Sequence, residues 1–239
     1  MVDLTPAEIA VLRDFQTGGR RIPRGREIIA EGRRYDGLLT LIDGVSLRYR
    51  LLHDGRRQVL NIALPGDFIG FPGCFFENAL YTITALTECV VASVPFSRLM
   101  GLFERHPRLA AAIFWSLSCE TATYAEHLID VGRRSALERV AQLLLEMLVR
   151  LQAIGLASEN SYRLPLTQEL IADALGLSVQ YVNHTLRQLR EDGLVDIEGP
   201  RVTIKHLDSL IQLADFERTY LSRPRTAELR AEHWGGLAK

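Results

Sequence analysis

The chain has 239 residues, a length near that of two modest domains, and 47% of its residues are apolar while 24% are charged. This composition excludes extended disorder as the dominant state. The 28 basic and 29 acidic side chains give a formal net charge of −1, which excludes a protein that coats nucleic acid through a large basic excess. Taken by itself, the charge argues against nucleic-acid binding.

Cysteine content and hydropathy indicate the compartment. Cys74, Cys89 and Cys119 are too few and too far apart for a disulfide framework or a Cys-x-x-Cys site. The N-terminal residues include acids rather than a basic stretch followed by an apolar one, and no run of about 18 apolar residues occurs. We therefore expect a cytoplasmic protein with no membrane segment.

The first hundred residues predict a short helix followed by a β-rich unit. A capping box of Thr5 and Glu8, with Pro6 at the first helical position, starts a helix that runs to about Phe15. From residue 20 to residue 95, short β-type runs alternate with glycines, which is typical of a small barrel or roll. The predicted parts are a strand at 45–51, a hairpin turn at 53–55, a run at 59–64, a turn at 65–67, a last pair of strands over 81–94 and a short helix at 97–104.

The stretch 107–131 has no glycine and no internal proline, which predicts one long helix. Six of its residues recur at spacings of 3, 4, 3, 4 and 3, the pattern of a two-helix coiled coil, so we expect dimerisation through this helix. These dimer-interface candidates are Phe114, Leu117, Thr121, Tyr124, Leu128 and Val131. The alternative is an amphipathic helix that packs on its own domain. Gly132 is the predicted hinge, and a capping box of Ser135 and Glu138 starts a further helix to about Ile154.

Residues 164–204 contain the most informative pattern of the chain. Thr167 caps one helix, Gly176 supplies a left-handed turn residue, and Ser178 caps a second helix at 179–190. Two helices joined by such a short turn form a helix-turn-helix. After Gly193, the runs 194–197 and 202–205 flank a turn and predict a β-hairpin wing. The alternative is a winged domain that is used for protein contacts.

The second of these helices has an outer face suited to the DNA major groove. Its buried stripe is Val182, Leu186 and Leu189. Gln and Asn can pair with adenine, Arg and His can donate to guanine, and Val can contact a thymine methyl group. The base-reading candidates are therefore Val179, Gln180, Asn183, His184 and Arg187. Hydroxyl, amide and basic groups nearby can bind phosphates. These phosphate candidates are Thr167, Gln168, Ser178, Tyr181, Arg201 and Lys205.

The order of these elements resembles the CRP/FNR family of bacterial transcription regulators, most specifically in the stretches 60–70 (LNIALPGDFIG) and 166–195. The resemblance implies an α+β fold with a cyclic-nucleotide-binding-like β-roll, a long dimerisation helix and a C-terminal winged helix-turn-helix. It implies a non-enzymatic homodimer, more often an activator, that binds a palindromic operator in double-stranded DNA and contacts RNA polymerase. The expected divisions are a roll at 1–106, the dimerisation helix at 107–132, the DNA-binding domain at 133–220 and a tail at 221–239.

Departures from the family pattern bear on the effector. Members that bind cyclic AMP have a glutamate soon after the Gly-Asp-Phe-Ile-Gly run and an Arg-Ser/Thr pair further on. Here those places hold 71–74 (FPGC) and 81–83 (YTI), and residues 58–97 contain neither Lys nor Arg. A buried phosphate would lack a cation, so we expect no cyclic AMP. Three cysteines cannot supply the four thiolates of an iron–sulfur cluster. We expect no cofactor, with an unknown small ligand in the roll as the alternative.

Several questions stay open at this stage. Haem binding stays open, because no sequence spacing identifies an axial ligand among His53, His106, His127 and Cys74. Control of activity can come from expression level, from a ligand in the roll, or from oxidation of a cysteine, although free cysteines are commonly buried apolar residues. His184 can make DNA affinity depend on pH or can be a neutral contact. A ligand-binding signalling module that acts through protein contacts, without DNA, is the alternative function.

The charge of the C-terminal half makes placement the deciding factor for DNA binding. Residues 133–239 contain 14 basic and 14 acidic side chains, so this half is neutral overall. We therefore expect selected basic residues to face the DNA while the acids point elsewhere, which predicts a modest dependence of affinity on salt. The residues expected to face DNA are Arg133, Arg134, Arg187, Arg201 and Lys205.

Overall fold

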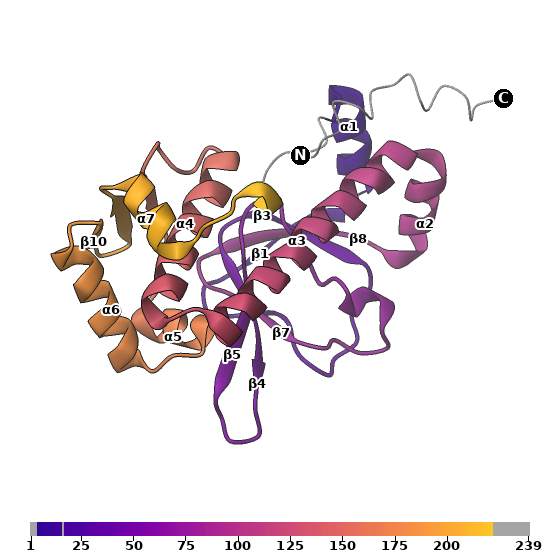
Figure 1. Ribbon diagram of the computed structural model, residues 1–239. Helices are drawn as coiled ribbons and strands as arrows, with labels where there is room; N and C mark the ends of the chain where they lie inside the picture. The colour runs from indigo at the N-terminus through magenta and orange to yellow at the C-terminus, as the bar shows by residue number, and fades with distance from the viewer. Residues whose placement is uncertain (1–3, 16, 222–239) are drawn as a thin grey trace.

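The structure is a computed structural model that describes residues 4–15 and 17–221 (Figure 1). Its first part consists of α1 (Pro6–Phe15), β1 (Thr17–Ile22), β2 (Glu27–Ile29), β3 (Leu38–Asp43), β4 (Ser46–Leu51), β5 (Arg57–Ala63), β6 (Phe68–Ile69), η1 (Gly73–Phe75), β7 (Thr82–Ala85), β8 (Cys89–Val94) and α2 (Phe96–Arg105). Its second part consists of α3 (Pro107–Arg133), α4 (Ala136–Ala153), β9 (Ser161–Arg163), α5 (Gln168–Leu175), α6 (Val179–Glu191), β10 (Val195–Glu198), β11 (Arg201–Ile204), α7 (Leu207–Ala214) and η2 (Thr219–Leu221).

The β-rich part is a roll of two four-stranded antiparallel sheets. One sheet has the strand order β1-β8-β3-β6 and the other β2-β7-β4-β5. Apolar residues between them, such as Leu41, Ile69 and Ile83, are at most 2% exposed. The roll confirms the predicted fold class. The prediction that 81–94 forms a strand pair is wrong, because β7 and β8 lie in different sheets and each pairs with strands distant in sequence.

Strand β4 departs from simple apolar and polar alternation. Arg48 is only 4% exposed, whereas Leu51 near the hairpin is 55% exposed. The reason is tertiary: the first half of β4 is covered by α3, and the second half extends into the hairpin whose turn includes Gly55 at φ +86°. A charged residue can be buried here because an acidic residue of α3 pairs with it.

The long helix α3 crosses in front of the roll and connects it to the C-terminal part (Figure 1). It continues through Gly132 to Arg133, so the predicted helix break at Gly132 is wrong by two residues. Arg134 is extended, and Ser135 and Glu138 then form the predicted capping box of α4. Gly132 does not end the helix, because the backbone hydrogen bonds of α3 continue past it. The helix ends at Arg134, whose backbone is extended.

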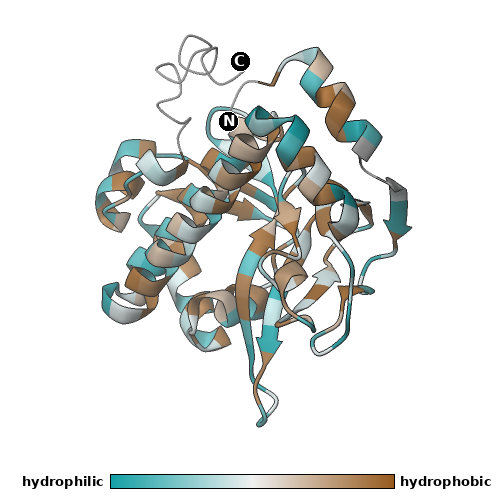
Figure 2. Cartoon of the chain, turned by 90° about the vertical axis from the view of Figure 1, so that its right-hand side faces the viewer, coloured by the Kyte–Doolittle hydropathy of each residue, from teal (hydrophilic) through white to brown (hydrophobic). Residues whose placement is uncertain are grey.

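The C-terminal part packs α4, α5, α6 and α7 against a small sheet of strand order β10-β11-β9. Strand β9 is three residues long and pairs with the wing strand β11. Figure 2 shows both apolar and polar residues on the helices, as expected for helices with one buried face. No helix among the described residues has the length and apolarity needed to cross a membrane. Of the predicted tail at 221–239, residues 222–239 lie outside the described part of the chain.

Candidate nucleic-acid interface

The helix-turn-helix is built by three local signals, all of which the structure confirms. The Thr167 hydroxyl accepts a hydrogen bond from the Leu170 backbone N–H at 3.3 Å and starts α5. Gly176 ends this helix at φ +64°, a left-handed conformation that favours glycine. The Ser178 hydroxyl accepts from the Tyr181 N–H at 3.2 Å and starts α6. The turn between the two helices is therefore fixed by the left-handed backbone of Gly176 and by the Ser178 cap.

Helix α6 has one buried face and one free face. Val182, Leu186 and Leu189 are at most 5% exposed and pack on α4 and α5, as predicted. The five base-reading candidates, Val179, Gln180, Asn183, His184 and Arg187, are all exposed. A helix with this free face and a wing beside it has the shape that enters a major groove.

Contacts within the free face limit how its side chains move. The Asn183 amide donates to Gln168 Oε1 at 3.1 Å, so Gln168, a phosphate candidate, is also the group that orients Asn183. Arg187 Nη2 lies 3.4 Å from His184 Nδ1, and its Nε lies 3.7 Å from a carboxylate oxygen of Glu191. Gln180 is exposed at the first turn of α6.

The phosphate candidates fall into two groups. Thr167 and Ser178 use their hydroxyl oxygens as helix caps, and a capping hydroxyl still has its proton to donate. Tyr181 is 62% exposed, and Arg201 is exposed on the wing, while Lys205 Nζ lies 3.4 Å from Asp196 Oδ2. The prediction that Arg134 faces DNA is wrong. Its guanidinium is paired with Asp130 at 2.7 Å and with Glu126 at 3.2 Å, and its side chain is 12% exposed.

The exposed face of α3 is rotated around the helix relative to the face that the sequence predicts for the dimer contact. Phe114 and Leu128 are each 74% exposed, and Thr121 is exposed between them. Leu117 instead packs on the core between α2 and α3, and the Tyr124 hydroxyl bonds to Arg48 and Glu120. Val131 is 48% exposed and lies at the rim of the cleft between α3 and the roll. The residues at the free positions of the heptad are Ala111, Phe114, Ser118, Thr121, Ala125, Leu128 and Gly132, all exposed.

The comparisons with known proteins agree with this geometry. Residues 19–106 match the family model of the cyclic nucleotide-binding domain, and residues 138–213 match that of the Crp-like helix-turn-helix domain. The chain is 36% identical over 193 residues to the nitrogen fixation regulation protein FixK of Bradyrhizobium diazoefficiens, with 80% of each chain covered. The chain belongs to the CRP/FNR family of transcription regulators. Like its relatives, this CRP/FNR regulator is a DNA-binding regulator of transcription and not an enzyme.

Two further likenesses extend over most of this CRP/FNR chain. It is 30% identical over 191 residues to the transcriptional activator protein FnrL of Cereibacter sphaeroides, covering 77% of this chain and 75% of that one. The solved structure of FixK2 from Bradyrhizobium japonicum superposes with a TM-score of 0.73 at 27% identity, covering 83% of this chain and 96% of that one.

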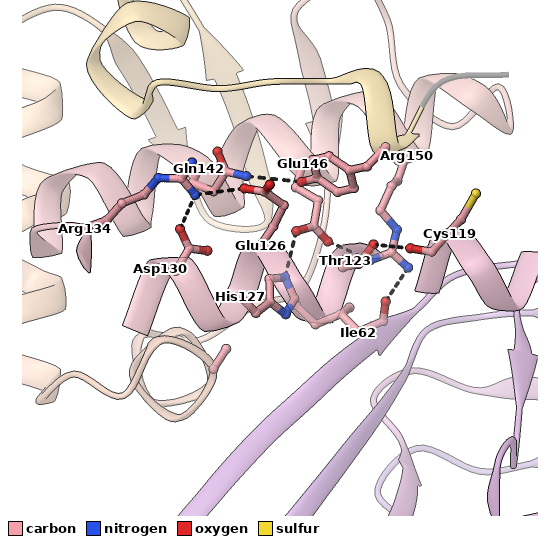
Figure 3. A network of polar contacts seen from close by, with 12 residues as sticks. Ile62, Cys119, Thr123, Glu126, His127, Asp130, Arg134, Gln142, Glu146 and Arg150 are labelled. Carbon is pink, nitrogen blue, oxygen red and sulfur yellow. Dashed lines mark hydrogen bonds and ion pairs between the residues drawn. The ribbon is translucent and has the colours of Figure 1, made fainter. Parts of the chain in front are cut away.

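A buried polar network connects the three parts of this CRP/FNR regulator (Figure 3). Glu146 of α4 is completely buried; one of its oxygens lies 2.8 Å from His127 Nε2 of α3, and the other accepts from Arg150 at 2.9 Å. Arg150 also donates to the Ile62 carbonyl oxygen and to Asp67 in the roll, at 2.8 and 2.9 Å. Helix α3, helix α4 of the C-terminal part and the roll therefore share one set of charges. The only sequence signal for it is a glutamate and a glutamine inside the apolar run of α4.

Two more contacts join these parts, and the sequence analysis predicts neither of them. Arg57 of β5 pairs with Asp173 of α5 at 2.6 Å, so the roll holds the first helix of the helix-turn-helix directly. Arg139 donates to the Val131 carbonyl oxygen of α3 and to the Leu175 carbonyl oxygen of α5, at 3.0 and 3.2 Å. These bonds satisfy carbonyl groups at two helix ends that have no partner within their own helices. Together, the contacts of Arg57 and Arg139 position the helix-turn-helix, and with it α6, relative to α3.

The pair of His127 and Glu146 makes stability depend on pH. Burial acts to lower the pKa of His127, but the Glu146 carboxylate outweighs it and leaves this pKa above its ordinary value of about 6.5. The protonated imidazole is favoured in the folded state, so its contribution to stability is complete below the unfolded-state pKa. The contribution is lost as the pH rises through the higher folded-state pKa.

We therefore expect the free energy of unfolding to fall as the pH is raised from about 6 to 8, and this part of the fall to disappear in the His127→Gln variant. Urea titrations at several pH values measure it. His53→Gln, in the exposed hairpin turn, is the matched control and should keep the full pH dependence. An unchanged pH profile in His127→Gln would show that this imidazole is not the linked group.

Proposed function

We propose that this regulator acts as a homodimer that places one α6 helix in each half of a palindromic operator and activates transcription through contact with RNA polymerase. The likeness to the transcriptional activator protein FnrL supports activation as the direction of control. The proposal includes the division into a roll (1–106), a dimerisation helix (107–132), a DNA-binding domain (133–220) and a tail (221–239). Helix-turn-helix dimers place their half-sites about one DNA turn apart, which sets the expected operator length.

The observation that carries the proposal is the free face of α6. Gln180, Asn183 and Arg187 are exposed on one side of a helix whose other side is buried, and no described element covers them. Amide side chains favour adenine and the guanidinium favours guanine, so this face has the chemistry to read a mixed sequence. The exposed wing residue Arg201 is placed to bind the adjacent backbone.

The free heptad face of α3 supports the homodimer. Its small residues Ala111, Ser118, Ala125 and Gly132 alternate with Phe114, Thr121 and Leu128, so two copies can approach closely while the larger side chains fill the spaces between them. The Ser118 and Thr121 hydroxyls donate to carbonyl oxygens of their own helix at 2.9 Å. They therefore add little polarity to the face. The proposed seam keeps Phe114, Thr121 and Leu128 from the sequence prediction and replaces its other three residues.

Contacts at the place of the cyclic-nucleotide cassette support the absence of that effector. Phe71, Phe75 and Phe96 stack edge to face there, with ring centroids 5.9 and 5.6 Å apart. The buried Arg48 comes from β4, and its charge is already paired with Glu120 at 2.7 Å. A cyclic phosphate would therefore meet aromatic rings and a cation that is not free. Among the described residues, no three His, Cys, Asp or Glu side chains gather as a metal site.

Alanine substitutions in α6 test the proposal. We expect Gln180→Ala or Asn183→Ala to cost about 1 to 3 kcal/mol of binding free energy on the operator and little on random DNA, because only the operator satisfies the amide groups. Fluorescence anisotropy with DNA from upstream of its own and neighbouring genes, at about 0.1 M salt, measures both affinities. Gln212→Ala, an exposed glutamine on α7, is the matched control. Equal losses on both DNAs would show that these residues do not read bases. If the protein bound none of these upstream DNAs, the proposed function would be contradicted.

A further inference from the structure

A groove of about 360 Å³ lies where α1, the roll, α3 and α4 meet. Its wall is mostly apolar and includes Leu64 and Phe68 from the roll, Trp115 from α3 and Ile154 from the end of α4. Residues 70–83, which stand in place of the family's cyclic-nucleotide cassette, contribute nothing to the described wall. The groove is therefore a feature separate from the nucleotide site of the fold.

The groove lies on the side of α3 away from the proposed dimer seam. An α-helix turns by about 100° per residue, so Cys119 of the groove wall is about 140° around the helix from Phe114 of the seam. Ala112 and Thr123, also in the wall, lie on the same side as Cys119. A second copy packed on the seam therefore leaves this groove open.

The end of the described chain returns to this groove. After α7, Asp215 adopts a left-handed conformation at φ 47°, and its carbonyl oxygen accepts from Arg134 Nη2 at 3.4 Å. The Tyr220 hydroxyl then accepts from Gln142 Nε2 of α4 at 3.1 Å, and Leu221 is itself part of the groove wall. This return path lies beyond residue 213, where the match to the helix-turn-helix family model ends. Residues 222–239 therefore start at the groove.

The chemistry of residues 222–239 complements the groove. They include three large apolar side chains, Leu229, Trp234 and Leu237, which match an apolar wall. The charged residues of the wall are already paired, Asp67 with Arg150 at 2.9 Å and Glu120 with the buried Arg48 at 2.7 Å. The match between the segment and the groove therefore depends on apolar side chains.

We propose that residues 222–239 occupy this groove in their own chain, with Trp234 as the apolar anchor. Trp234 is thirteen residues beyond Leu221, and a random-coil chain of thirteen residues spans about 20 Å on average, so the groove is within reach of Trp234. A short tether gives an effective concentration of about 1 mM, at which an intrinsic dissociation constant of about 0.1 mM leaves about nine-tenths of the molecules docked. The docked segment ties the roll, α3 and α4 together.

Two tryptophans make the test direct, because Trp115 lies in the groove and Trp234 in the segment, and the chain has no others. In the full chain with Trp115→Phe, all tryptophan emission comes from Trp234. We expect this emission to be blue-shifted and its acrylamide quenching to be at least threefold weaker than in a synthetic peptide of residues 222–239. Adding Ala112→Phe, which fills the groove, should restore peptide-like quenching. Ala10→Phe, which adds the same bulk on the exposed side of α1, should not.

A second measurement uses the opposite change. A chain that ends at Leu221 should expose the groove and bind the apolar dye ANS several-fold more strongly than the full chain, and Ala112→Phe should abolish the difference. Emission of Trp234 that matches the free peptide, or equal ANS binding by both chains, would overturn the proposal. A blue shift that vanishes on dilution would also overturn it in favour of a second copy as the occupant. Neither readout involves DNA, so this proposal and the operator proposal fail independently.

Discussion

The double substitution Phe114→Glu with Leu128→Glu is expected to convert the dimer into a monomer and to lower operator affinity by about 100-fold or more. Both side chains are 74% exposed on α3 and belong to the proposed seam. Two like charges facing each other across a coiled-coil seam oppose association, and a monomer loses the linked second half-site, which contributes a factor of about 10² to 10⁴ to binding. Sedimentation velocity measures the oligomeric state and anisotropy the affinity.

Single substitutions distinguish the proposed seam from the one predicted by spacing in the sequence. Ala125→Glu should also weaken the dimer, because Ala125 lies on the free face although the sequence seam omits it. Val131→Glu should leave the dimer intact, because Val131 belongs to the sequence seam but lies outside the proposed one, at the rim of the cleft between α3 and the roll. Ile9→Glu on α1, 39% exposed, is the control for an added charge at an apolar surface position. A stable dimer of the double variant would refute this seam.

The substitution Glu146→Ala is expected to lower the free energy of unfolding by about 3 to 5 kcal/mol, the usual cost of removing one partner from a buried ion pair. Glu146 is completely buried, and its loss leaves Arg150, whose side chain is 15% exposed, with one carboxylate partner instead of two. Burial alone would raise the pKa of Glu146, but His127 and Arg150 outweigh it and hold this pKa below its ordinary value. The carboxylate is therefore charged in the folded protein.

Urea unfolding monitored by circular dichroism measures this loss of stability. Glu146→Gln, which keeps the shape and can still accept hydrogen bonds, should cost less than Glu146→Ala. Glu191→Ala is the control: Glu191 is 70% exposed and 3.7 Å from Arg187, and surface pairs of this kind contribute about 0 to 1 kcal/mol. Equal costs for Glu146→Ala and Glu191→Ala would mean that the buried network adds nothing to stability.

Local signals explain why the DNA-binding part was predictable. Thr167, Gly176 and Ser178 each act within three or four residues along the chain, so their effects do not depend on distant partners. The buried stripe of α6 follows from the helical period and was correct at Val182, Leu186 and Leu189. The roles of the outer residues in reading DNA stay predictions.

Long-range pairing explains what was missed. Strand β9 forms only because β11 lies beside it, and Arg48 is buried only because Glu120 of α3 faces it. The exposed face of α3 has the same origin, because Leu117 packs in the protein's own core and the Tyr124 hydroxyl bonds to Glu120 of its own chain. Heptad spacing identifies that a helix has an apolar face but not which of two adjacent faces its own domain covers.

The sequence by itself determined the order of the parts, the fold class, the helix-turn-helix with its caps and the face of α6 that is free. These depend on backbone propensities, capping and helical periodicity, which act over a few residues. Only the tertiary structure decided the free face of α3, the charge network around Glu146 and the groove at Leu221. Those features depend on burial and pairing between residues far apart in the chain, because the cost of burying a charge depends on which partner the fold brings to it.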